Sequence, residues 1–297
     1  MSPILFSIYI DELFVQLKQA GLGCYIGHLF AGIVGYADDI NLLAPTKAAL
    51  SKMLDITNQF GVEFKIKFNP DKSKLVIFEG NKRVIGSIVF NGSVIESDTT
   101  PYVIHLGNQL GPIFCKEFML KRIYDFIRRV NILYAKFKFI SSSTRYSLFK
   151  SYCMSLYGCQ LWDLDSKHME LFYVAWRKCV RRIFKLNNRT HCALLSHICC
   201  DAPIKVQLIH RFNKFSKGVL KSNIFFVKYC GQLAANGSRS TFCNNVNVAN
   251  VHRYCFDTID THALQQTAGA IKDFIRMWDI SPDDDNLKCI IDYLCTL

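Results

Sequence analysis

Apolar positions along the chain recur first at mixed helix and strand spacing and then, from about residue 115, at helix spacing alone. Ser2-Pro3 predicts the start of a first helix, because serine caps helices and proline suits their first turn. Gly21 is a plausible end of that helix. Pro45-Thr46 predicts the start of a second helix, which we expect to close at Gly61.

Strand patterns follow the second helix. Residues 62–68 alternate strictly and predict a strand with one buried and one charged face. Asn91-Gly92 predicts a two-residue hairpin turn between two short apolar runs. Further features predicted here are a turn at Asn69-Pro70-Asp71, a strand over residues 75–78 and a strand over residues 102–106 that ends at Gly107.

Between the two predicted helices, residues 31–44 hold two strand-length apolar runs around Asp38-Asp39. This pattern predicts a hairpin with two carboxylates at its turn. Adjacent carboxylates repel each other and must stay hydrated or bind a cation. Mg²⁺ is commonly held by one or two carboxylates and substrate phosphates, and paired ions clamp the oxygens of a phosphoryl transfer. An ordinary surface turn remains the alternative, because Asp is a favoured turn residue.

The second part of the chain is patterned as long helices. Ser141-Ser142-Ser143 predicts a break between two helices, and the hydrophobic pattern becomes weak after about Gly231. The predicted helices cover residues 115–140, 144–161, 167–186, 193–200, 204–229 and 262–278, with a short one after Pro282. The order of elements predicts an α+β layer followed by an all-α bundle.

Positive charge is concentrated in the predicted bundle. The formal net charge is +12, but residues 115–230 alone carry 22 Lys/Arg against 6 Asp/Glu, a net of +16. Residues 1–114 carry 9 against 10, a net of −1, and residues 231–297 carry 5 against 8, a net of −3. Such an excess favours a polyanionic partner.

Basic side chains recur every three to four residues on two of the predicted helices, which places them on one face of each. Such ridges suit phosphate backbones, although charged helix faces can also be merely solvated. The candidate nucleic-acid contacts are Lys121, Arg122, Arg128, Arg129, Arg177, Lys178, Arg181, Arg182 and Lys185.

The 13 cysteines are scattered, odd in number and free of any CxxC pair. The N-terminal apolar run lacks a basic leader, and the apolar stretches are shorter than a membrane span requires. We expect an intracellular protein that is neither secreted nor bound to a membrane, with reduced thiols. His and Cys crowd residues 191–200, and Cys230, Cys243, His252 and Cys255 follow, but their spacing argues against zinc.

Four pieces of the chain, in this order, resemble the reverse transcriptases of LINE-like non-LTR retrotransposons. They are Ser2-Pro3-Ile4-Leu5-Phe6, Tyr36-Ala37-Asp38-Asp39, Asn69-Pro70-Asp71-Lys72-Ser73 and the strand that ends at Leu106-Gly107. Tyr157-Gly158 with Trp162, and the basic helix over residues 177–185, resemble the region after the polymerase core. The resemblance is specific over about residues 1–115 and looser over residues 115–215.

The resemblance implies a right-hand polymerase that copies an RNA template from a DNA primer with deoxynucleoside triphosphates. Residues 1–112 would be part of the palm, residues 113–230 the basic thumb and the region after it, and residues 231–297 a helical tail of unassigned role.

The resemblance also implies roles for single residues. Asp38 would be the principal ligand and Asp39 the weaker ligand of a two-metal Mg²⁺ site, and Tyr36 would lie near the primer end. Lys72 would lie near the leaving pyrophosphate, where a cation is chemically sensible, or else be a solvated turn lysine. Leu106-Gly107 would grip the primer or else end a plain edge strand.

In this family, a further Asp upstream of the Ser2–Phe6 piece bridges both metals, and the chain begins inside that piece. We therefore expect that the chain, as a truncated gene model or a decayed copy, polymerises nothing alone. One alternative is a non-catalytic nucleic-acid-binding protein derived from a retroelement. Another is an unrelated metal-dependent phosphoryl-transfer enzyme that would need Asp11, Glu12 or Asp71 near the hairpin.

Overall fold

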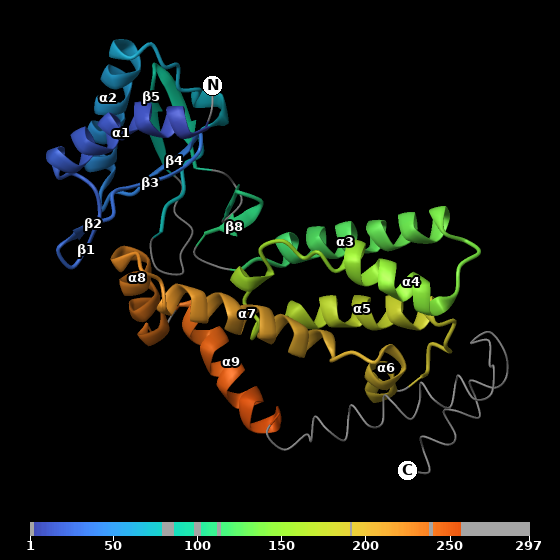
Figure 1. Ribbon diagram of the computed structural model, residues 1–297. Coiled ribbons are helices and arrows are strands. Elements are labelled where there is room, and N and C mark those ends of the chain that lie inside the picture. Colours follow the sequence, from blue (N-terminus) through green and yellow to red (C-terminus); the bar gives the residue numbers. More distant parts are fainter. Residues whose placement is uncertain are drawn as a thin grey trace. The chain divides into compact units, whose positions relative to one another are not determined.

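The computed structural model describes residues 3–78, 86–97, 102–111, 114–190, 192–237 and 240–256. The chain forms two compact units, shown in Figure 1. Unit 1 is Met1–His105 with Gln109–Ile113, and unit 2 is Leu106–Asn108 with Phe114–Leu297. Unit 1 combines helices with small hairpins, whereas unit 2 is helical. The fold is helix-rich with small antiparallel sheets, which is compatible with the predicted α+β class.

Two packed helices, α1 (Pro3–Ala20) and α2 (Lys47–Glu63), form the helical layer of unit 1. Two of the predicted helix ends are confirmed. Gly21 has the left-handed conformation (φ 64°) that ends α1, and the Thr46 hydroxyl caps α2 by accepting from the Ala49 N–H at 3.1 Å. The predicted stop at Gly61 is wrong, because α2 continues to Glu63 with Gly61 buried in it. The core cluster contains Ile10, Leu13, Leu17, Met53 and Phe60.

The strands of unit 1 pair as hairpins rather than as one continuous sheet. The predicted turn at Asn91-Gly92 is confirmed, since both residues have the positive φ (49° and 74°) of a type I′ turn. The pairs are β1 (Tyr25–Ile26) with β2 (Leu29–Phe30), β3 (Ile33–Tyr36) with β4 (Asp39–Leu42), β5 (Ser87–Phe90) with β6 (Ser93–Glu96), and β7 (Val103–His105) with β8 (Asn108–Leu110).

The strand predicted over residues 62–68 is wrong. The helix α2 ends at its C-cap residue Phe64, and the Ile66 N–H then binds the Gly61 carbonyl at 2.9 Å, which reverses the chain. Burial nevertheless alternates, because Phe64, Ile66 and Phe68 pack against the core between exposed neighbours. The alternation marks an extended segment lying on the core rather than a strand.

Three other short elements of unit 1 were predicted in part. The turn at Asn69 is confirmed as the 3₁₀ helix η1 (Pro70–Lys72), which the Asn69 side chain caps. In the strand predicted over residues 75–78, Leu75 forms an isolated bridge to Ser97. The strand predicted over residues 102–106 is shorter, and it continues through a turn into β8, which was not predicted.

Unit 2 is built from helices around buried aromatic side chains. Phe172 lies at the centre, with its ring centroid 5.3 Å from that of Phe126 and 5.4 Å from that of Trp162. The helix α3 packs against α5, and α7 packs against α8 and α9. The elements are α3 (Lys116–Lys136), α4 (Ser142–Leu148), the π-helix η2 (Phe149–Cys153), the 3₁₀ helix η3 (Cys159–Leu161), α5 (Met169–Ile183), α6 (Cys192–Cys199), α7 (Ile204–Leu220), α8 (Phe225–Asn236) and α9 (Thr241–Phe256).

The helix predictions for unit 2 are correct in order and wrong in several bounds. The helix predicted over residues 144–161 is α4 followed by η2, and it ends before residue 154. The helix predicted over residues 204–229 is interrupted at residues 221–224, which separate α7 from α8. The helix α9 was not predicted, and the helices predicted over residues 262–278 and after Pro282 lie outside the described residues. Within the described residues, no helix is long and apolar enough to cross a membrane.

Candidate functional site

The predicted acidic hairpin is confirmed. Strands β3 and β4 pair antiparallel with Ile33 opposite Leu42 and Tyr36 opposite Asp39. Ala37 and Asp38 therefore form the two-residue turn, and Ala37 has a positive φ of 51°. Both carboxylates are exposed, Asp38 in the turn and Asp39 at the first position of β4.

One face of this hairpin is fixed to the core of unit 1. Ile33, Ile40 and Leu42 pack against the core cluster. Gly35, directly opposite Ile40, lies on the Phe14 ring of α1, and a Cβ at Gly35 would be 2.7 Å from the Phe14 Cζ atom. The close approach holds the carboxylate-bearing end of the hairpin on a rigid helix.

The other face of the hairpin carries the polar side chains. Tyr36 and Asp39 are directly opposite each other, and Tyr36 is 66% exposed. Two positions after Asp39 on the same face, Asn41 hydrogen bonds through Nδ2 to the His105 Nε2 of β7 at 3.0 Å. The bond between Asn41 and His105, which sequence analysis missed, ties β4 to β7 on the face that bears Asp39.

The two carboxylates are available to a cation. In the described part of the chain, neither Asp38 nor Asp39 has a side-chain hydrogen bond or an ion pair. Their oxygens are hard ligands of the kind that Mg²⁺ prefers, and two protein carboxylates can suffice when substrate phosphates complete the coordination. Among the described residues, no group of three or more His, Cys, Asp or Glu side chains could hold a metal ion. The donor set therefore fits part of a magnesium site.

Lys72, the predicted third catalytic residue, is exposed at the end of η1. The turn that presents it is rigid, because the Asn69 side chain accepts from the Asp71 N–H at 3.0 Å and the Ser73 hydroxyl donates to the Asn69 carbonyl at 2.9 Å. Asp71, one of the alternative acids, is exposed in the same turn.

The predicted primer-contacting residues Leu106 and Gly107 form the β7–β8 turn, with positive φ values of 46° and 73°. In unit 2 this turn lies beside the Tyr157-Gly158 motif. A Cβ at Gly158 would overlap the Asn108 side chain, and one at Gly107 would lie 3.5 Å from the Tyr157 ring. The structure thus brings together two motifs, Leu106-Gly107 and Tyr157-Gly158, that carry the family resemblance and lie about 50 residues apart in the sequence.

The same turn approaches basic residues of α3. A Cβ at Gly107 would be 4.0 Å from an Arg122 guanidinium nitrogen, and this guanidinium lies over the Phe118 ring, 5.0 Å from its centroid. Lys121, the residue that directly precedes Arg122 on α3, is exposed. Together with Tyr157, which is 68% exposed, these residues make a basic and aromatic patch within unit 2.

Two further arginines of α3 are engaged in contacts within the protein. Arg128 forms an exposed ion pair with Asp125 at 3.5 Å. Arg129 donates to the Ser155 carbonyl at 3.2 Å and to the Ser155 hydroxyl at 3.1 Å. Arg129 therefore links α3 to the segment that follows η2.

The amphipathic pattern predicted for α5 is confirmed, with Phe172, Trp176 and Val180 buried. Its basic face is less uniform than expected. Arg177 forms an ion pair with Glu170 of the same helix, while Lys178 is exposed. Lys185 is exposed just beyond the end of α5, with a positive φ of 53°.

The remaining two arginines of α5 also bind within unit 2. Arg181 donates twice to the Thr190 carbonyl, at 3.1 and 2.7 Å, and so fixes the chain after the helix. Arg182 donates to the Asn131 side chain of α3 at 2.7 Å and lies over the Tyr134 ring, 4.1 Å from its centroid. These charges join helices in addition to facing solvent.

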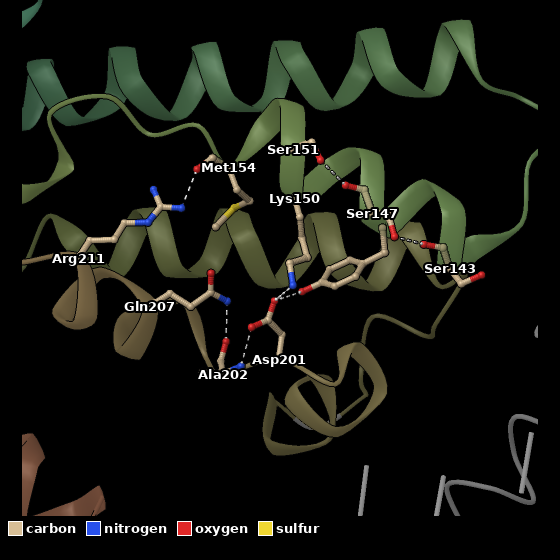
Figure 2. A network of polar contacts seen from close by, with 10 residues as sticks. Ser143, Ser147, Lys150, Ser151, Met154, Asp201, Ala202, Gln207 and Arg211 are labelled. Carbon is tan, nitrogen blue, oxygen red and sulfur yellow. Dashed lines mark hydrogen bonds and ion pairs between the residues drawn. The ribbon is translucent and has the colours of Figure 1, made fainter. Parts of the chain in front are cut away.

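A polar network that sequence analysis missed joins η2 to the start of α7 (Figure 2). Lys150 pairs with Asp201 at 2.8 Å, and the Tyr146 hydroxyl donates to the same carboxylate oxygen at 3.4 Å. Burial, aided by the nearby Cys199 and Asp201, raises the Tyr146 pKa. Burial also raises the pKa of the Cys199 thiol to about 12. A protonated phenol and thiol beside a paired carboxylate indicate a structural role.

Several cysteines that attracted a metal interpretation have other surroundings. Cys199 is buried, and Cys192 is exposed and accepts a bond from Arg181 at 3.5 Å. Cys230 and Cys243 are half-buried on α8 and α9. The side chains of four further members of these Cys/His groups, His191, His197, His252 and Cys255, lie outside the described residues.

The N-terminal part of the chain is similar to known proteins. Residues 1–110 match the family model described as reverse transcriptase (RNA-dependent DNA polymerase). A segment of 83 residues is 32% identical to the retrovirus-related Pol polyprotein from the type-2 retrotransposable element R2DM of Drosophila melanogaster. This segment is 28% of the chain and 8% of that polyprotein. No solved structure matches the chain. The resemblance to reverse transcriptases of LINE-like elements is confirmed for this part.

Proposed function

From the match of residues 1–110 to the reverse transcriptase family, we propose that the chain is a fragment of an RNA-directed DNA polymerase of the non-LTR retrotransposon type. Unit 1 would supply part of the palm, with Asp38 and Asp39 as ligands of catalytic Mg²⁺. The observation that carries this proposal is the pair of exposed carboxylates, without protein partners in the described residues, at the tip of a hairpin packed on the core.

The chemistry proposed for unit 1 follows from its own residues. Bound Mg²⁺ would supply charge neutralisation for a primer oxygen attacking a nucleoside triphosphate. The packed face of the β3–β4 hairpin keeps both carboxylates in place, which such a reaction requires. Tyr36, exposed opposite Asp39, would contact the primer end, and Lys72 would bind the leaving pyrophosphate.

Unit 2 would act as the thumb that holds a template of RNA and a primer of DNA. Supporting features are its net positive charge, the exposed Lys121 and Lys178, and the patch in which Leu106-Gly107 lies beside Tyr157. Contacts of this kind are mainly to phosphates and are insensitive to sequence.

We further propose that the chain alone does not extend a primer. Two-metal catalysis needs carboxylates that converge from more than one element, and Asp38 and Asp39 belong to one hairpin. Incubating residues 1–297 with a primed RNA template, Mg²⁺ and deoxynucleoside triphosphates is expected to give no extension above background. Template-dependent extension would contradict this part of the proposal.

Metal binding tests the role of the acidic pair directly. We expect the chain to bind Mn²⁺ in the presence of a deoxynucleoside triphosphate, measured by the paramagnetic relaxation of water protons. Asp38→Asn with Asp39→Asn should weaken this binding at least about tenfold, because an amide is a poorer metal ligand than a carboxylate. Asp71→Asn is the matched control and should leave it unchanged.

Three outcomes separate the candidate functions. Loss of Mn²⁺ binding in the double variant supports the polymerase fragment. Loss in Asp71→Asn instead supports an unrelated phosphoryl-transfer enzyme. Nucleic-acid binding, together with Mn²⁺ binding that does not depend on Asp38 or Asp39, supports a non-catalytic nucleic-acid-binding protein.

A further inference from the structure

The loop between α3 and α4 presents an aromatic side chain entirely to solvent. Phe139 is 99% exposed, and its neighbour Phe137 is 41% exposed. Lys136 and Lys138 alternate with these two rings and are also exposed. In water, an exposed ring of this size forgoes the favourable transfer of its surface to an apolar environment. A position of this kind at the end of a helical pair (Figure 1) therefore suggests a partner for the ring.

The loop is held in this shape by a buried arginine. Arg145 of α4 is 4% exposed, and its guanidinium donates to the carbonyls of Phe137, Lys138 and Ile140 at 3.1–3.3 Å. The Ser141 side chain caps α4 at the other end of the loop. Phe139 thus projects from an ordered backbone, so little conformational entropy remains to be lost on binding.

The surroundings of the loop carry an excess of positive charge, part of which is paired: Arg128 pairs with Asp125 and Lys150 with Asp201. Residues 126–162 contain six Lys/Arg and no Asp/Glu. Two guanidiniums lie over the Tyr134 ring near the end of α3, with Arg182 at 4.1 Å and Arg145 at 5.0 Å from its centroid. A polyanion is the partner that this charge complements.

We propose that the loop binds single-stranded nucleic acid, with Phe139 stacking on an unpaired base and Lys136 and Lys138 contacting the flanking phosphates. An aromatic ring between cations is the arrangement that recognises single strands, since every base offers a π-face. One fully exposed ring offers little apolar area for insertion into a bilayer, and stable membrane binding needs more than one such signal. The inference goes beyond the proposed function and does not depend on Asp38 or Asp39.

The test measures binding of the whole chain to a labelled oligothymidylate of about 12 nucleotides by fluorescence anisotropy. Phe139→Leu keeps an apolar side chain but removes the stacking surface, and it should weaken binding about tenfold. Phe139→Trp should retain the affinity. Phe225→Leu is the matched control, because Phe225 is 60% exposed but already stacked on Tyr229, and it should leave the affinity unchanged.

Two further measurements keep the result specific. Binding of a duplex of the same length should be unaffected by Phe139→Leu, because duplex bases are already stacked. Replacing Lys136 and Lys138 together by Gln should reduce the slope of log affinity against log salt by about 1.4, the value for two phosphates of a single strand. Equal urea midpoints for all variants would show that the fold is intact.

The proposal is overturned if Phe139→Leu binds the oligothymidylate as tightly as the unchanged chain. It is also overturned if the unchanged chain binds vesicles containing phosphatidylserine in preference to the oligonucleotide and loses that binding in Phe139→Leu. Substitution of Asp38 and Asp39 should not alter oligothymidylate binding, so failure here and failure of the polymerase proposal are distinguishable.

Discussion

At the scale of the residue, the acidic hairpin depends on one position without a side chain. Gly35 faces the Phe14 ring of α1, and its strand partner Ile40 packs against the core cluster. A methyl group at this position would be 2.7 Å from Phe14, closer than two carbon atoms can pack. The ring, the hairpin or both would have to shift.

We expect Gly35→Ala to lower the free energy of unfolding by about 1–3 kcal/mol, the usual cost of overpacking. Urea unfolding followed by circular dichroism measures the change. Gly218→Ala is the control, because Gly218 lies in α7 with no heavy atom within 4 Å of the added Cβ, and it should raise stability by about 0.5–1 kcal/mol. A Gly35→Ala protein as stable as the parent would show that the hairpin lifts easily from α1.

Sequence was a good guide to single residues wherever local chemistry determines conformation. Asn91-Gly92 specified a type I′ turn, and Asp38-Asp39 between apolar runs specified a hairpin tip. The sequence was a poor guide to side chains whose hydrogen-bond partner lies elsewhere in the chain. Asn41 gave no sign of its bond to His105, 64 residues later, nor Arg181 of its bonds to the Thr190 carbonyl.

At the scale of the element, the order of helices and strands could be predicted from the sequence, but the residues at which they end could not. The alternation of residues 62–68 predicted a strand, yet the chain there lies on the core because α2 and its cap take up the first residues. Apolar spacing ran on unbroken from residue 204 to 229, although the Lys221 cap ends α7. Periodicity reports which positions are buried, whereas caps and packing decide where elements stop.

The helix α9 shows how a weakly patterned segment can still be fixed in place. Its Asn245 is 1% exposed and bridges two backbone groups of another segment, donating to the Trp162 carbonyl and accepting from the Leu164 N–H, both at 2.8 Å. An asparagine-rich sequence predicts no buried face. The spacing of apolar residues therefore could not predict that Asn245 is buried and bonded to the backbone.

Asn245→Ala should lower the free energy of unfolding by about 2–4 kcal/mol, because it leaves two buried backbone groups without partners. Thermal and urea unfolding of the whole chain would measure the loss. Asn250→Ala, at an exposed position of the same helix, should stay within about 0.5 kcal/mol of the parent. Similar effects of the two substitutions would mean that α9 does not depend on this bridge.

At the scale of the whole molecule, charge predicts the kind of partner better than it predicts the contacts. The net of +16 over residues 115–230 is a property of composition. In the folded unit, several of those cations already serve the protein: Arg129 binds Ser155, Arg181 binds Thr190 and Arg182 binds Asn131. The charge free to meet a phosphate is therefore smaller than the sequence total.

The exposed and the engaged cations of α5 should consequently respond differently to neutralisation. Lys178→Gln removes an exposed charge and should reduce the slope of log affinity against log salt for duplex nucleic acid by about 1, with stability unchanged. Arg181→Gln removes two bonds to the Thr190 carbonyl and should instead lower the free energy of unfolding by about 1–3 kcal/mol, with a smaller change in slope. Salt titrations and urea unfolding of both variants measure the two effects. If Arg181→Gln changes the slope as much as Lys178→Gln while remaining as stable as the parent, the arginines of α5 bind phosphate rather than the protein. In that case the net charge counted from the sequence would be the charge available for contact with nucleic acid.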